Sequence, residues 1–78
     1  MPEYLPNRIT WVAFLERSFW ALERAYIKAY YRNDVLLMDA LFDSMCRYSR
    51  RHVEVDGLPV IALCDFAPLD RRLKDVFM

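Results

Sequence analysis

The hydrophobic positions of this chain follow a helical period through most of its length. Residues 1–9 form an extended lead before the pattern starts, because Pro2 and Pro6 oppose helix formation. Residues 10–32 are predicted as one helix with a wide apolar arc facing the core. The arc consists of Trp11, Val12, Phe14, Leu15, Ser18, Phe19, Leu22, Ala25, Tyr26, Ala29 and Tyr30.

A second helix is predicted over residues 34–51, with Asp34 as its N-cap. Asp43 and Arg47 are four residues apart and should pair on its surface. The connection at Asn33 is short, so the two helices form an antiparallel hairpin. The predicted core face of this helix consists of Leu37, Met38, Leu41, Met45 and Tyr48.

The pattern changes to alternation in residues 52–63, which predicts a two-stranded β-hairpin. Asp56 and Gly57 form a typical type I′ turn pair between short apolar strands. One hairpin face should cover the helices. Ile61 and Leu63 lie on the other face, where we expect the last helix to cover them. The inner face would consist of Val53, Val55, Leu58, Val60 and Ala62.

The chain is predicted to end in a short helix over residues 67–77, with Pro68 in its first turn. The predicted fold class is α+β and mostly α, in a single domain of residues 1–78. Its elements are an antiparallel helical hairpin, a two-stranded β-hairpin and a short C-terminal helix, in the order α-α-β-β-α.

Three apolar residues of the first helix lie outside its core arc. Trp20, Ile27 and Tyr31 line up along the axis with Ala13, and we call these four residues the aromatic stripe. Charged residues border it, with Glu16 and Glu23 on one side and Arg17, Arg24 and Lys28 on the other. An aromatic surface with a charged border is typical of a protein contact. The alternative is that the N-terminal lead or the last helix covers the stripe.

Composition favours the contact interpretation. Apolar residues make up 56% of the 78 positions, which is more than so small a core can hide. The net charge of zero argues against a general nucleic-acid binder. We therefore expect a small non-catalytic protein-binding module, acting as a regulator, inhibitor or adaptor of a larger protein or as a homodimer.

A basic cluster supplies the alternative function, that of a nucleic-acid-associated regulator. It consists of Arg47, Arg50, Arg51 and His52 at the end of the second predicted helix. The acidic start of that helix would repel DNA, so this function ranks second.

The sequence contains little catalytic chemistry. Cys46, His52 and Cys64 do not have the spacing of a zinc site, and we expect neither a metal nor a cofactor. No nucleophile–base set or glycine-rich phosphate loop is present, so an enzyme is not expected. The longest uncharged run, residues 57–64, is far shorter than the roughly 20 residues of a membrane span. Without a signal-peptide pattern, we expect a cytoplasmic protein with two free thiols.

Overall fold

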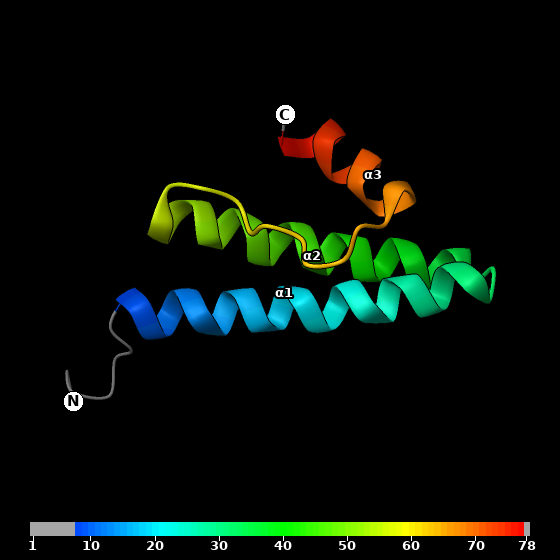
Figure 1. Cartoon of the computed structure of the whole chain (residues 1–78), viewed down its shortest axis with the longest axis horizontal. Coiled ribbons are helices and arrows are strands. Elements are labelled where there is room, and N and C mark those ends of the chain that lie inside the picture. The colour runs from blue at the N-terminus through cyan, green and yellow to red at the C-terminus, as the bar shows by residue number, and fades with distance from the viewer. Residues whose placement is uncertain (1–7, 78) are drawn as a thin grey trace.

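The computed structural model describes residues 8–77, and their side chains from residue 9 onward. Within these residues the fold consists of three helices: α1 (Arg8–Tyr31), α2 (Val35–Asp56) and α3 (Ala67–Phe77). The two long helices lie antiparallel, and α3 packs over the middle part of α2 (Figure 1). The predicted extended lead over residues 1–9 lies outside the described residues except for residues 8 and 9, where the prediction is wrong because they belong to α1.

The predicted β-hairpin over residues 52–63 is wrong, and so is the α+β fold class. The helix predicted to stop at Arg51 continues to Asp56, and no strand occurs within residues 8–77. The buried positions explain the extension. Met45, Ser49 and His52 are all buried at spacings of four and three residues, so the inner face of α2 continues through His52.

Gly57 ends α2 instead of turning a hairpin. Its φ of 86° is left-handed, and its N–H donates to the carbonyl of Val53 at 2.8 Å. A type I′ turn would also need a positive φ at Asp56, yet Asn33 is the one non-glycine residue with a positive φ in the described part of the chain. The same glycine signal therefore serves as a helix C-cap here.

After Gly57 the chain turns back and runs along the helical pair without regular secondary structure (Figure 1). We call residues 58–66 the return segment. It leads directly into α3, whose bounds agree with the predicted helix over residues 67–77. The predicted C-terminal helix is thus confirmed, while the residues before it form an irregular segment with bends at residues 58 and 63–64.

The core lies where α1, α2, the return segment and α3 meet. It is built around five buried side chains, those of Phe19, Tyr26, Met45, Val60 and Leu69. The predicted core arcs are correct near the middle of the helices and wrong toward their ends. Phe14 on α1 is 49% exposed and Leu37 on α2 is 41% exposed, because α3 and the return segment cover only part of the long hairpin.

The predicted helix connection is confirmed in detail. Asn33 adopts a left-handed φ of 56°, and the Asp34 carboxylate accepts the N–H of Leu37 at 3.2 Å. The predicted pair of Asp43 and Arg47 also forms, at 2.8 Å.

Candidate protein-binding surface

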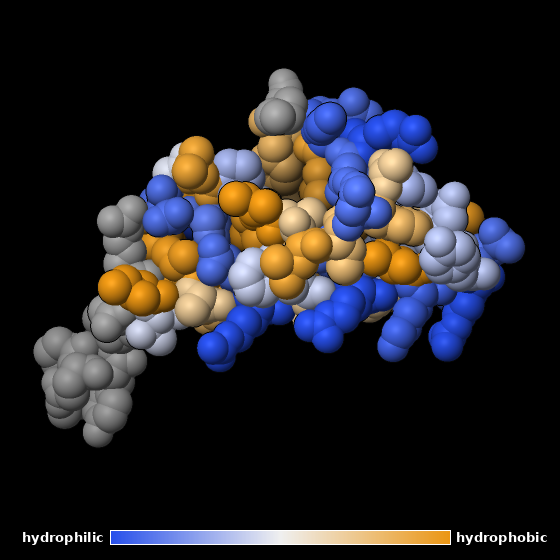
Figure 2. Space-filling model, in the orientation of Figure 1, coloured by the Kyte–Doolittle hydropathy of each residue, from blue (hydrophilic) through white to orange (hydrophobic). Residues whose placement is uncertain are grey.

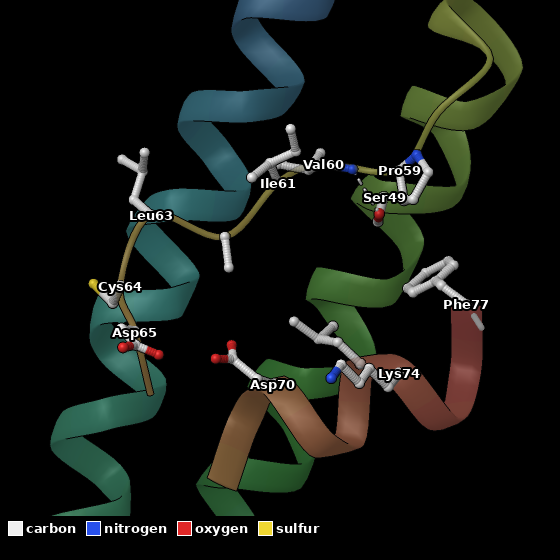
Figure 3. Close-up of a pocket in the computed structure, with 12 residues that line it drawn as sticks. Ser49, Pro59, Val60, Ile61, Leu63, Cys64, Asp65, Asp70, Lys74 and Phe77 are labelled. Atoms are coloured by element: carbon white, nitrogen blue, oxygen red, sulfur yellow. Dashed lines mark hydrogen bonds between the residues drawn. The ribbon is translucent and has the colours of Figure 1, made fainter. Parts of the chain in front are cut away.

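Side chains of α2 hold the first half of the return segment. The backbone N–H of Val60 donates to Ser49 Oγ at 3.1 Å (Figure 3). His52 Nδ1 hydrogen-bonds to the carbonyl oxygen of Leu58. Since Leu58 and Val60 are two residues apart, both bonds leave the same edge of the extended chain.

Side chains of α1 hold the other edge. Trp20 Nε1 donates to the carbonyl of Ile61 at 2.8 Å. The Glu23 carboxylate accepts the N–H of Leu63 at 3.2 Å and that of Cys64 at 3.1 Å. Side chains of both long helices therefore hold the backbone of the return segment, which forms no strand.

This arrangement fixes where the side chains of the return segment go. Val60 is buried and Ala62 is half-buried, whereas Ile61 is 80% exposed and Leu63 is 62% exposed. The expectation that the last helix covers Ile61 and Leu63 is wrong. The backbone that bears these two exposed aliphatic side chains is anchored by hydrogen bonds.

The aromatic stripe is divided by the return segment. Trp20 and Ile27 are half-buried, and Trp20 packs against the core while its indole bonds to the return segment. Tyr31 remains 72% exposed, with its ring 5.4 Å from that of Tyr30 and 6.0 Å from that of Phe66. The bond to Trp20 comes from residue 61 and not from α3, while cover by the N-terminal lead concerns residues outside the described part of the chain.

We define the apolar patch as Trp20, Ile61 and Leu63. The carbonyl oxygen of Ile61 accepts a hydrogen bond from the Trp20 indole. The N–H of Leu63 donates to Glu23, one helical turn further along α1. Figure 2 shows apolar side chains gathered over the middle of this face. The patch joins two segments that are about 40 residues apart in sequence.

The acidic and the basic border of the stripe differ in their contacts and exposure. Glu23 is fully buried, and Glu16 Oε2 lies 3.2 Å from His52 Nε2, so both acids serve the chain's own fold. Arg17, Arg24 and Lys28 are exposed, and none of them pairs with a carboxylate among residues 9–77. We call these three residues the basic row. Hydrophilic side chains follow the edge of the molecule where α1 lies (Figure 2).

A cavity of about 480 Å³ opens beside the patch, between the return segment, α2 and α3 (Figure 3). Ile61 and Leu63 border it on one side, and Leu73 and Phe77 of α3 line the other. Most of the surface of its wall is apolar, so the cavity suits an apolar side chain.

The alternative nucleic-acid residues do not form one open surface. His52 is 3% exposed and is used inside the fold. Arg47 pairs with Asp43, and Arg51 pairs with Glu54 at 2.7 Å. Of the four, Arg50 is exposed without a carboxylate partner among the described residues.

Both cysteines are free thiols. Burial raises the pKa of Cys46. Desolvation, together with the charge of the Glu23 carboxylate and a hydrogen bond to it, raises the pKa of Cys64. A raised pKa lowers the thiolate fraction, which is the opposite of what a nucleophilic cysteine needs. Within the described residues, no three His, Cys, Asp or Glu side chains cluster in a way that could hold a metal ion.

The sequence did not predict a role for Ser49, and its pattern placed Trp20 and Glu23 on an outer surface. Ser49 carries one faint signal, since it continues the spacing of Met45 toward His52.

Comparison with family models, curated proteins and solved structures found no match. Across residues 8–77, no helix has the length and hydropathy needed to cross a membrane.

Proposed function

We propose that this chain is a small non-catalytic protein-binding module and that the apolar patch is its contact surface. One observation carries the proposal: Ile61 and Leu63 are exposed although the backbone that bears them is anchored to both long helices. An anchored backbone favours binding, because less backbone conformational entropy is lost on association. Trp20 beside them is the residue type most often found at binding hot spots.

The position of the proposed surface differs from that of the aromatic stripe. Trp20 is shared by both, while Ile61 and Leu63 take the place of the more distant Tyr31. Glu16 and Glu23 act as internal supports of this surface and are not contact residues. The proposed function is still protein binding, but the proposed contact surface is centred where α1 meets the return segment.

The experiment compares three immobilised forms of the chain in a lysate of its native cells: wild type, the double variant Ile61→Ser/Leu63→Ser, and the control Leu36→Ser. Leu36 is 84% exposed at the far end of the hairpin. We expect wild type and control to retain the same protein and the double variant to lose it. That protein must then form a complex of defined mass with the purified chain.

Folding is monitored in parallel. Because all three substituted side chains are exposed, the free energy of unfolding should change by about 0.5 kcal/mol or less in each variant. If the double variant retains the same protein as wild type while remaining folded, the patch is not the binding site and the proposal fails.

A further inference from the structure

The charges next to the apolar patch indicate the chemistry of its binding partner. We propose that the patch binds an acidic amphipathic segment of another protein, whose apolar side chains contact Trp20, Ile61 and Leu63 and whose carboxylates pair with the basic row. This inference rests on the proposed function and adds the chemistry of the partner to it.

The first step is the asymmetry of α1. The stripe is bordered in sequence by two acids and three bases, so acids would offset most of the positive charge. In the structure Glu23 is fully buried against the return segment and Glu16 faces His52. Both acids are therefore engaged in contacts within the fold, so the exposed charges that border the patch are basic.

The second step is the geometry of the basic row. Arg17, Arg24 and Lys28 are separated by seven and four residues, so they follow one line along α1. The line is about 16 Å long at about 1.5 Å per residue. It runs parallel to the patch and on one side of it. A helix carrying acids along one flank and apolar residues along the next has the complementary arrangement.

The third step is the cavity on the opposite side of Ile61 and Leu63. It can take an apolar side chain from a segment that already lies across the patch. Asp65, Asp70 and Lys74 line the same cavity, so this border of the surface carries charges of both signs. An anionic membrane could match only the basic row, whereas a protein segment can also place an apolar side chain in the cavity.

The test is a selection of binders from a random library of phage-displayed peptides of about 15 residues, enough for four helical turns. The target is the full wild-type chain. We expect the enriched peptides to combine Asp or Glu with large apolar residues at helical spacing. Enrichment without an acidic excess, or no enrichment, would overturn the inference.

Affinities of the enriched peptides are then measured on a charge-reversed chain, Arg17→Glu/Arg24→Glu. We expect Kd to rise at least about tenfold, because attraction becomes repulsion at two sites. The matched control Arg50→Glu/Arg71→Glu has the same net charge, with its changes on α2 and α3, and should bind like wild type. Equal weakening in both variants would overturn the inference. If the reversed chain is misfolded, Arg17→Gln/Arg24→Gln replaces it, with the same direction of change expected.

Two further measurements distinguish the other occupants. Vesicles rich in phosphatidylglycerol should not sediment the chain; sedimentation that is lost in Arg17→Glu/Arg24→Glu would assign the surface to a membrane and overturn the inference. Mass-resolved sizing should give a monomer; a dimer that Leu63→Ser dissociates would assign the surface to a second copy. Peptides that need Ile61 and Leu63 but show no acidic preference would overturn the inference and leave the proposed function intact.

Discussion

Glu23 of α1 accepts the backbone N–H of Cys64 at 3.1 Å, across 41 positions of sequence. Its second carboxylate oxygen accepts the neighbouring N–H of Leu63. One fully buried acid thus satisfies two consecutive backbone donors at the point where the return segment bends toward α3. Without these bonds the two N–H groups would lack a protein acceptor beside the core, which is costly.

The first prediction concerns that carboxylate. Glu23→Gln should lower the free energy of unfolding by about 2 kcal/mol, because an amide accepts one N–H bond and turns its own N–H₂ group toward the other donor. Urea denaturation measures the change. The control Glu54→Gln breaks only an exposed pair with Arg51 and should cost about 0.5 kcal/mol or less. Equal stability of the two variants would show that Glu23 does not anchor the segment.

The second prediction concerns Gly57. Gly57→Ala should destabilise the chain by about 1 kcal/mol, because an L side chain is disfavoured at a φ of 86°. A Cβ at this position would meet no atom within 4 Å, so the cost is purely that of the backbone. Gly57→Asn should cost less, since Asn tolerates the left-handed region. Thermal unfolding separates the two variants, and a stabilising Ala substitution would mean that α2 does not end in this conformation.

The helices could be predicted from the sequence because their signals are local. The apolar period, the capping Asp34 and the proline at the start of α3 act within a few residues of the structure they specify. The central core positions follow for the same reason. These parts of the prediction are confirmed, including the pair of Asp43 and Arg47.

The region after Arg51 could not be predicted in this way. Its inner face continues through Ser49 and His52, which are polar and interrupt the apolar pattern. The alternating Val53 and Val55 then imitate a strand over a few residues. Ser49 and His52 can be buried because they hydrogen-bond to the return segment. These bonds form only once the chain has folded back onto α2.

The candidate surface was predicted only in part, for a related reason. Sequence placed Trp20 and the charged borders on the outside of α1, and exposure of the basic row agrees with that. Glu23 and Ile61 interact with partners about 40 positions away, and no local pattern distinguishes an anchoring acid from a solvated one. The apolar patch could be recognised only once both segments were placed.

The third prediction concerns thiol reactivity. Because the pKa values of Cys46 and Cys64 are both raised, each thiolate fraction at neutral pH is smaller than in a free cysteine. Both thiols should therefore react slowly with iodoacetamide, Cys46 more slowly because it is buried. Peptide mass spectrometry over a pH series measures each site. The rates should rise with pH, and unfolding in urea should equalise them.

Glu23→Gln provides the internal comparison for this third prediction. Removing the negative charge lowers the pKa of Cys64 toward its ordinary value, so Cys64 should be alkylated faster at a fixed neutral pH. Glu54→Gln should leave both rates unchanged. Faster alkylation of Cys46 than of Cys64 in the native chain would contradict the placement of the two thiols.

The last prediction concerns Arg72, which attaches α3 to the helical pair. Its guanidinium lies 4.1 Å from the centre of the Phe42 ring, and Nη1 donates to Tyr26 Oη at 3.1 Å. It also lies 3.2 Å from the Asp39 carboxylate. Because the ring and hydroxyl contacts are partly buried, Arg72→Met should lower the free energy of unfolding by about 1–2 kcal/mol.

Asp39→Asn removes only the exposed ion pair and is the matched control for Arg72→Met. It should cost about 0.5 kcal/mol or less, as exposed pairs usually do. Arg72→Lys keeps the charge but loses the planar stacking on Phe42, so its cost should fall between the other two. Urea denaturation of the three variants measures this order. If Asp39→Asn cost as much as Arg72→Met, the ion pair and not the aromatic contact would hold α3 in place.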